Sequence, residues 1–395
     1  MPKLARLIES RWRAIPILGV GQILAWGAIY YTPVLIVPLI AEERGWSLTL
    51  AMSGFSLGLL AAGLSSPFVG AMIDRHGGHI VMPIGNLLGA AGLVGIAYAA
   101  APLAYLAVWI VLGTAMAAAL YDPAFATLAR IFGADARRAI TLLTFIGGFA
   151  STVSWPATRV FIDAIGWRGT YLVYAALLAL VAAPLLAFAL PREHAAAEVK
   201  PEGPIPAHLR HLPARGLPFL LVAIAFALYA FIPSALAAHM LAIFARGGIQ
   251  PATVVAIGAL FGPAQVTARL LEFSFARRTH PLVIARFAVA LLIFAYGALA
   301  FLGMSTLAAA SFAILFGTTN GLMTIARGTV PLALFGASGY GRLIGRIARP
   351  ALVMQAVGPL VLAYVAERFS DPAALASIAA FALAALVSLA AIRRP

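Results

Sequence analysis

Arg269 has the most informative chemical surroundings in this sequence, because it lies inside a long apolar run with Gln265 four positions before it. Side chains four residues apart lie on one face of an α-helix. A guanidinium keeps its charge where water is scarce, and its planar fork can hold a carboxylate through two hydrogen bonds. The preceding Gly262 and Pro263 suit a helix that lines a cavity. The pattern predicts a site for an organic anion; the alternative is a structural pair of Arg269 with Glu272 or with a lipid phosphate.

Asp122 lies within another apolar run and is the acid that we expect to lie deep in the structure. Ionisable groups inside a membrane are costly, so each is a candidate for function. A buried carboxyl group can take up a proton near neutral pH, as a proton carrier must. The sequence therefore predicts a proton-carrying role for Asp122. The alternative is that Asp122 holds a neighbouring helix or pairs with an arginine.

Amide and aromatic side chains near the middle of other apolar runs complete a candidate binding cavity. An amide or a phenol that faced lipid would be costly, so each either lines a polar cavity or makes a hydrogen bond between packed helices. The candidates are Gln22, Trp26, Tyr30, Tyr31, Tyr229, Asn320 and Gln355.

Composition identifies the elements that must position these side chains. Of the 395 residues, 63% are hydrophobic and 10% are charged, where a soluble domain carries about 25% charged residues. This balance excludes a soluble globular enzyme and indicates a polytopic membrane protein, as does the mean hydropathy of +0.99. The net charge of +14 is spread over short loops, so we expect no nucleic-acid partner. The chain has no cysteine, and we expect neither a cofactor nor a resident metal ion.

Apolar runs of about 20 residues can cross about 30 Å of hydrocarbon as α-helices, and the sequence contains twelve of them. They start near Ile15, Ser47, Ile80, Leu103, Ala139, Gly169, Leu217, Ile249, Pro281, Ser305, Ile344 and Pro372. Lysine and arginine gather in alternate loops, which predicts that both chain ends are cytoplasmic. On the outer side, Arg159 and Asp163 are four residues apart, and we expect them to form a periplasmic gate pair.

The polar stretch 192–215 separates the runs into two sets of six. We therefore predict a first bundle at 1–191, a cytoplasmic linker at 192–215 and a second bundle at 216–395. The segment Thr127-Leu128-Ala129-Arg130 echoes Thr324-Ile325-Ala326-Arg327 at an offset of about 200 residues, and such self-similarity indicates a repeat. The sequence thus predicts two pseudo-symmetric six-helix bundles with a cavity between them.

The loop after the second run reads Gly70-Ala71-Met72-Ile73-Asp74-Arg75-His76-Gly77-Gly78-His79. Gly70 lets two helices approach closely, and Gly77 with Gly78 allows a tight turn. This loop resembles the signature G-x-x-x-D-R-x-G-G-R of the major facilitator superfamily, with His79 in place of the last arginine. The resemblance extends over essentially the full chain and implies an all-α transmembrane fold of twelve helices.

In that family, the charged residues of this loop bind the two halves together in the outward-open state. The resemblance implies this gating role for Asp74 and Arg75. It also implies partners near the cytoplasmic ends of the fourth and eleventh runs, where Arg130 and Arg346 are the candidates for Asp74.

The face that carries Gln265 and Arg269 resembles the D-x-x-x-R of monocarboxylate transporters in the same superfamily. The stretches Glu43-Arg44-Gly45-Trp46-Ser47 and Gly166-Trp167-Arg168 are also common in this monocarboxylate and oxalate–formate branch. The resemblance implies that Arg269 holds the carboxylate of a substrate. Two departures are that Gln265 replaces the acid of the pattern and that the first run lacks the lysine of some members.

The resemblance implies a secondary transporter, not an enzyme, that acts as a monomer in a bacterial-type cytoplasmic membrane. The expected substrate is a small organic anion, with possible proton coupling. The fifth run lacks the glycine-rich pattern of drug antiporters, which disfavours the alternative of a proton-driven exporter for an apolar or cationic compound. That alternative stays open.

Overall fold

The computed structural model describes residues 11–192, 212–275 and 279–393; these residues form helices and turns, with no strand among them. Most of the expected linker and the two chain ends lie outside the described residues. The main helices of the first half are α2 (Ala14–Ala25), the π-helix η2 (Trp26–Tyr31), α3 (Pro33–Arg44), α4 (Leu48–His76), α5 (Gly78–Tyr98), α6 (Pro102–Ala119), α7 (Tyr121–Phe132), α8 (Ala136–Gly147) and α9 (Ala150–Leu177). Those of the second half are α10 (Gly216–Arg246), α11 (Pro251–Ala259), α12 (Phe261–Phe275), α13 (Pro281–Leu302), α14 (Thr306–Phe335), α15 (Tyr340–Arg368) and α16 (Asp371–Ala391).

Eleven helical stretches of the described chain are long and apolar enough to cross a membrane. One of them, Ala136–Ala189, has 54 residues and would extend about 80 Å, far beyond about 30 Å of hydrocarbon. It is interrupted at Gly166, whose φ of 72° lies in the region that glycine tolerates best. Because this stretch supplies two crossings, the eleven become twelve, which confirms the predicted number of transmembrane helices.

The chain divides into two compact units, which we call unit 1 and unit 2. Unit 1 comprises Met1–Pro204 with Ala337–Arg349, and unit 2 comprises Ile205–Gly336 with Pro350–Pro395. The first turns of α15 therefore belong to unit 1, although the sequence division placed the whole of 216–395 in the second bundle. The helix continues into unit 2 from Pro350 onward.

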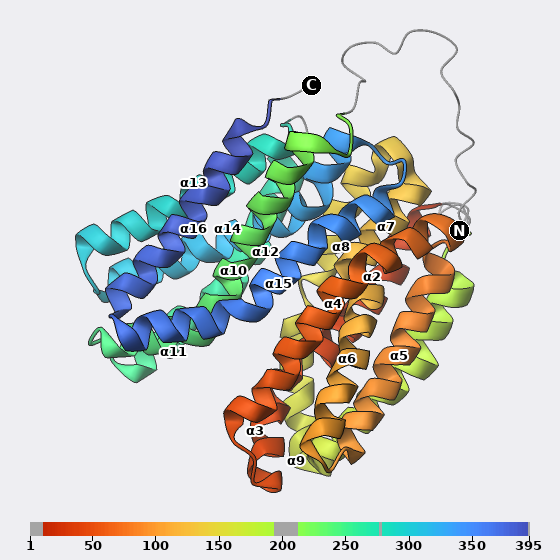
Figure 1. The fold of residues 1–395 in the computed structure, drawn as a ribbon, viewed down its shortest axis with the longest axis horizontal. Helices are drawn as coiled ribbons and strands as arrows, with labels where there is room; N and C mark the ends of the chain where they lie inside the picture. Colours follow the sequence, from red (N-terminus) through yellow and green to blue (C-terminus); the bar gives the residue numbers. More distant parts are fainter. Residues whose placement is uncertain (1–10, 193–211, 276–278, 394–395) are drawn as a thin grey trace, which may run out of the picture. The chain divides into compact units, whose positions relative to one another are not determined.

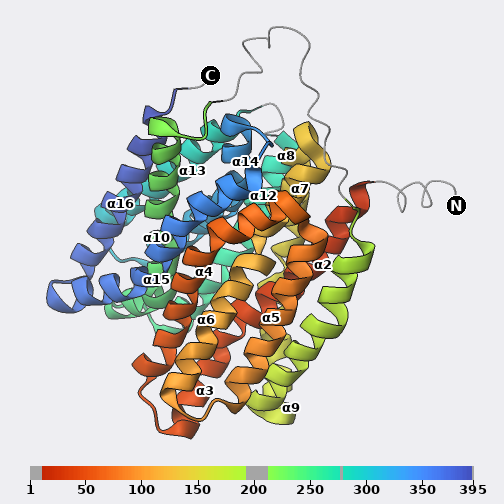
Figure 2. The same cartoon turned by 45° about the vertical axis from the view of Figure 1, so that its right-hand side comes forward.

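Unit 1 is built around α4, α5 and α6, which lie side by side in both views (Figures 1 and 2). The predicted fourth span is broken at Leu120, between α6 and α7, where ψ is −155°. Pro123 explains the break, because a proline has no N–H for the carbonyl four residues earlier and its ring crowds that carbonyl. The freed carbonyl of Ala119 accepts a hydrogen bond of 2.8 Å from Nε2 of Gln22 on α2.

Unit 2 contains a close contact between α12 and α14. Gly317 and Gly321 of α14 face the main chain of α12 at Phe261 and Gln265, where a Cβ atom would lie 2.5 Å from the carbonyl oxygen in each case. Small residues at such positions let two helix backbones approach closely. This contact sets the distance between polar side chains of the two helices.

Candidate functional site

Arg269 lies in the interior of unit 2. Arg269 and Glu272 are the two charged side chains that are buried among the described residues, with 4% and 6% of their surface exposed. Nη2 of Arg269 donates a hydrogen bond of 2.8 Å to Oε1 of Gln265 and one of 3.5 Å to Oγ1 of Thr324. The guanidinium thus donates to neutral acceptors from α12 and α14.

A chain of hydrogen bonds connects this arginine with other predicted site residues. Tyr229 of α10 donates through its hydroxyl to Oδ1 of Asn320 on α14, at 3.3 Å. Thr324 donates to the main-chain carbonyl of Asn320 at 2.7 Å, and Thr324 in turn accepts from Arg269. We call Gln265, Arg269, Tyr229, Asn320 and Thr324 the polar cluster. It contains four of the predicted contact residues, and Thr324 is a member that the sequence reasoning missed.

Gln355 is placed on α15, where its main-chain carbonyl accepts a hydrogen bond of 2.6 Å from Oγ of Ser234 on α10. Glu272, which the sequence analysis named as an alternative structural partner of Arg269, differs from expectation in its burial, because Asp122 was expected to be the deep acid. In the structure Asp122 is only partly buried, whereas Glu272 is buried one turn after Arg269. The sequence already indicated that Glu272 lies beside Arg269, since residues three apart on a helix share a face.

Unit 1 brings together the aromatic residues predicted on the first span. The ring of Trp26 lies 4.8 Å from that of Tyr30, 5.8 Å from that of Tyr31 and 5.1 Å from that of Tyr121, which follows the break at Leu120. Nε1 of Trp26 donates to Oε1 of Gln22 at 3.1 Å. The first three aromatic residues belong to the π-helix η2, a form that often occurs at functional sites. We call these four aromatic residues the aromatic cluster.

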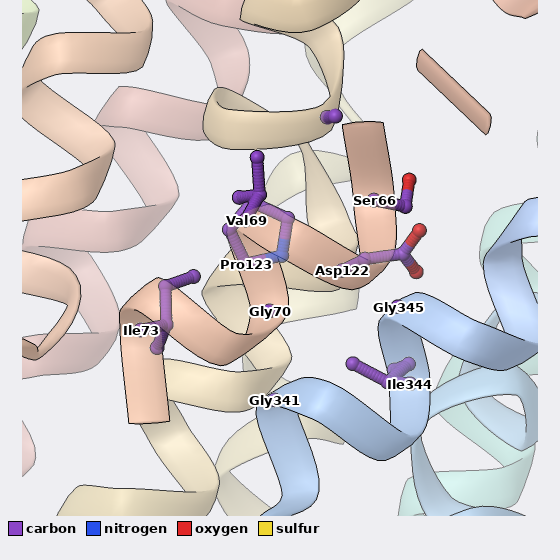
Figure 3. Close-up of a pocket in the computed structure, with 10 residues that line it drawn as sticks. Ser66, Val69, Gly70, Ile73, Asp122, Pro123, Gly341, Ile344 and Gly345 are labelled. Atoms are coloured by element: carbon purple, nitrogen blue, oxygen red, sulfur yellow. The ribbon is translucent and has the colours of Figure 1, made fainter. Parts of the chain in front are cut away.

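Asp122 is the second residue of α7, so its carboxylate lies in the first turn, where a negative charge favours the helix. It lines a small pocket of unit 1 (Figure 3). The cavity volume is about 10 Å³, roughly the space of one water molecule, so the pocket is too small for an organic ligand. The lining residues are Ser66, Val69, Gly70, Ile73, Ala117, Asp122, Pro123, Gly341, Ile344 and Gly345.

The loop between α4 and α5 places the predicted gating residues at the start of α15. The carboxylate of Asp74 accepts hydrogen bonds of 2.8 Å and 2.7 Å from the main-chain amides of Gly341 and Arg342. These amides belong to the first turn of α15, which has no acceptor of its own for them. Nη1 of Arg130 donates to the main-chain carbonyl of Asp74. The expectation that arginine side chains are the partners of Asp74 was thus incomplete, because two main-chain amides of α15 donate to its carboxylate.

The glycines of this loop serve packing and turning. Gly70 lies against the main chain of Gly341, where no Cβ atom fits, and Gly78 lies equally close to Thr127 of α7. Gly77 separates α4 from α5 with a φ of 84°. Arg75, which follows Asp74, is exposed.

The predicted periplasmic gate pair is an exposed contact within one helix. Nε of Arg159 lies 3.0 Å from Oδ2 of Asp163 on α9, and their side chains are 72% and 57% exposed.

A second, larger contact joins two helices of unit 1. Nη2 of Arg168 lies 2.6 Å from Oε1 of Glu43, and Nε1 of Trp167 donates to Oε2 of Glu43, also at 2.6 Å. This contact connects α3 with α9. Its residues come from the stretches 43–47 and 166–168, to which the sequence analysis assigned no structural role.

Unit 2 carries an equivalent tie. Nε and Nη2 of Arg246, at the end of α10, donate to Oδ2 and Oδ1 of Asp371, at the start of α16, at 2.8 Å and 2.7 Å. The hydrogen bond to this carboxylate raises the pKa of Arg246. We refer to Glu43–Arg168 and Arg246–Asp371 as the terminal ties.

Comparison with known proteins places this arrangement in a family. The family model of the Major Facilitator Superfamily matches residues 18–349. Monocarboxylate transporter 11 of Mus musculus is 32% identical over 145 residues, which are 36% of this chain and 32% of the mouse protein. Its counterpart from Homo sapiens is 29% identical over 138 residues, or 35% of this chain and 28% of the human protein. The chain therefore matches about a third of the length of these relatives.

Two solved structures share the fold along nearly the whole chain. The human organic anion transporter MFSD10 (TETRAN) has a TM-score of 0.73 at 16% identity and covers 96% of this chain and 99% of its own. The proton:xylose symporter XylE, bound to 6-bromo-6-deoxy-D-glucose, has a TM-score of 0.73 at 12% identity and covers 98% and 96%. The chain, a multi-pass membrane transporter and not an enzyme, belongs to the Major Facilitator Superfamily.

Proposed function

We propose that this transporter moves a small organic anion, a carboxylate, by alternating access, and that Arg269 holds the carboxylate. The burial of Arg269 in unit 2, with 4% of its surface exposed, carries the proposal. The planar fork of a guanidinium can hold a carboxylate through two hydrogen bonds, so a carboxylate is a ligand that suits Arg269. Gln265, Asn320 and Tyr229 supply neutral hydrogen-bonding groups around it, and Gln355 is a further candidate contact.

The names of similar proteins support this substrate class. The two relatives are named monocarboxylate transporters, and MFSD10 is described as an organic anion transporter. The aromatic residues Trp26 and Tyr30 would contact the apolar body of the substrate. The protein would act as a monomer in a bacterial-type cytoplasmic membrane, with both chain ends in the cytoplasm. Its two bundles would comprise 1–191 and 216–395, the limits inferred from the sequence.

Proton coupling is the second part of the proposal, and Asp122 is the proposed proton-carrying residue. Gly70, Asp74, Arg75, Gly77, Gly78 and Arg130 would form the cytoplasmic gate. Arg159 and Asp163 would contribute to the outer gate in a conformation in which the pair meets a second helix.

The test is uptake of a panel of radiolabelled carboxylates into proteoliposomes, with a pH gradient imposed or withheld. We expect saturable uptake that Arg269→Ala reduces by roughly a hundredfold, because removal of a buried charged partner costs about 2 to 5 kcal/mol. Arg269→Lys keeps the charge but not the fork, so it should retain a small part of the flux. Arg368→Ala is the matched control, because Arg368 is an exposed arginine of unit 2.

Uptake that is unchanged in a folded Arg269→Ala variant would remove Arg269 from the site. An absence of flux for every carboxylate would favour the alternative, a proton-driven exporter of an apolar or cationic compound. Asp122→Asn should abolish the dependence of uptake on the pH gradient, and a retained dependence would exclude Asp122 as the proton carrier.

A further inference from the structure

The pocket beside Asp122 joins the proposed proton carrier to the start of α15. Four helices line it, and Asp122 is the one lining residue with an ionisable side chain. Figure 3 shows the carboxyl group of Asp122 between Ser66 of α4 and Gly345 of α15. The carboxylate therefore faces the same first turns of α15 that Asp74 holds through two main-chain amides.

The wall that α15 contributes to this pocket is packed at backbone distance. A Cβ atom on Gly345 would collide with the carbonyl of Ser66, and one on Gly341 would collide with the carbonyl of Gly70. Ile344 fills the space between these two contacts and is 1% exposed. Because the remaining space holds about one water molecule, bulk water reaches Asp122 through this wall only when the segment Ala337–Arg349 moves away from α4.

Basic residues predominate among the charged groups around Asp122. The helices α4, α5, α6 and α8 pack against α7, and α15 lines the shared pocket. At the Asp74 end, the charged and titratable residues of these elements and of the turn after α7 are Asp74, Arg75, His76, His79, Tyr121, Arg130, Asp135, Arg137, Arg138, Tyr340, Arg342, Arg346 and Arg349. Most of them are basic. An ionised Asp122 is therefore attracted to the start of α15, whose exposed arginines are Arg342, Arg346 and Arg349.

We propose that Asp122 is a proton-controlled latch on the start of α15. The ionised carboxylate stabilises the packing of α15 on α4, whereas protonation removes that attraction and lets Ala337–Arg349 separate. Separation opens the pocket, so the proton leaves Asp122 on the side where α15 starts. The latch rests on the proton coupling proposed above and specifies how the proton acts on the gate.

Because the chain has no cysteine, single cysteines can report on this pocket without background. Ser66→Cys places a thiol in the pocket wall, at a side chain that is 3% exposed. Ser338→Cys, at an exposed position just before α15, is the matched control for delivery of the reagent and for ionisation of the thiol. The full-length protein in proteoliposomes is treated with a membrane-impermeant methanethiosulfonate on the side that modifies Ser338→Cys. The measured quantity is the ratio of the modification rates at the two positions.

We expect this ratio to rise about fivefold or more when the pH falls from about 8 to about 6, as protonation shifts the population toward the separated state. Asp122→Asn should give a high ratio at both pH values, and Asp122→Glu should restore the pH dependence. Asp74→Asn should raise the ratio but keep its pH dependence, because Asp74 is an anchor and not the proton-controlled group. Two results would overturn the latch: a ratio that does not change with pH in the protein that retains Asp122, or a ratio that still changes with pH in the Asp122→Asn variant.

The labelling needs no substrate, so it separates the latch from the proposed function. Arg269→Ala should leave the pH dependence of the ratio intact while it removes carboxylate uptake. A pH-dependent ratio without any carboxylate flux would support the latch and reject the substrate class. Proton-driven carboxylate uptake with a constant ratio would support the function and reject the latch.

Discussion

The two units are alike at one end of their helices and unlike in the middle. In unit 1, Glu43 at the end of the first span is paired with Arg168 at the start of the sixth. In unit 2, Arg246 at the end of the seventh span is paired with Asp371 at the start of the twelfth. The helices correspond, but the acid and the base have exchanged places. The repeat has therefore preserved the contact between the first and last helix of each unit and not the residues that make it.

The middles of the units differ although they share a sequence pattern. Ala119-Leu120-Tyr121-Asp122-Pro123 in unit 1 matches Ala259-Leu260-Phe261-Gly262-Pro263 in unit 2, each an alanine, a leucine, an aromatic residue, any residue and a proline. Leu120 leaves the helical region with a ψ of −155°, whereas Leu260 remains in it with a ψ of −22°. In unit 1 the carbonyl freed by Pro123 is paired with Gln22. A proline alone bends a helix, and here a full break coincides with a donor from another helix.

We propose that the difference marks the regions of each unit that contact the substrate. The ties at the helix ends hold each bundle together in the same way. The middles carry an aromatic cluster with a broken helix in unit 1 and a polar cluster with a buried arginine in unit 2. In a pseudo-symmetric transporter, the side chains that depart from the symmetry are the ones available for a substrate that has no such symmetry.

Among the variants that compare the two units, replacement of each proline by alanine gives the largest expected effect. Pro123→Ala allows α6 and α7 to join through Leu120, which turns Asp122 and removes the need for Gln22 at Ala119. We expect it to lower carboxylate flux roughly tenfold or more, since displacement by about 1 Å can cost about a hundredfold in rate. Pro263→Ala should change flux much less, because Leu260 is already helical. Equal losses in the two variants would contradict the distinction.

Gly321→Ala tests whether close helix packing, and not a break, positions the polar cluster. The new Cβ atom would lie 2.5 Å from the carbonyl oxygen of Gln265, so α12 must shift. We expect a loss of about 1 to 3 kcal/mol in the free energy of unfolding, measured by denaturant titration in detergent. Gly262→Ala is the control, because a Cβ atom there meets nothing within 4 Å. If both variants are equally stable, the close approach of α14 to α12 is not required.

Gln22→Leu tests the donor that accompanies the broken helix. Loss of the hydrogen bond leaves the buried carbonyl of Ala119 without its donor, and we expect a cost of about 1 to 3 kcal/mol in the same unfolding measurement. Thr319→Val in unit 2 is the control. Its hydroxyl also donates to a main-chain carbonyl, that of Ala288, at 2.9 Å, but Ala288 lies inside the continuous helix α13. The control should therefore cost less than Gln22→Leu, and the reverse order would disprove the role of Gln22.

The terminal ties should give the smallest effects, and similar ones. Their side chains are partly exposed, from 22% for Asp371 to 53% for Arg246, and exposed ion pairs contribute about 0 to 1 kcal/mol. Glu43→Gln and Asp371→Asn should each lower the melting temperature slightly in low salt and less in high salt. A much larger loss in one of the two units would show that the ties are not equivalent.

Sequence reasoning predicted the number of helices and the family because both depend on local patterns. The twelve apolar runs and the Gly70–His79 loop are readable one segment at a time. The grouping of Arg269 with Gln265 was also readable, since both lie on one helix face. Contacts between distant segments were not, and Arg246 with Asp371 is an example because 125 residues separate them.

Burial was the other quantity that the sequence could not supply. Glu272 and Asp122 both sit in apolar surroundings along the chain, yet Glu272 is buried in unit 2 and Asp122 is only partly buried in unit 1. The amides that hold Asp74 were equally out of reach. Every residue except proline carries such an amide, so nothing in the letters Gly341 and Arg342 marks them as partners.

Gly166 decides the parity of the membrane crossings. If its φ were negative and helical, α9 would run on as one rod, and the chain would make an odd number of passes. Everything after it would then start from the opposite leaflet, including the arginine-bearing loops of unit 2. A side chain at this position would strain a φ of 72°, so the absence of one Cβ atom fixes the orientation of half of the protein.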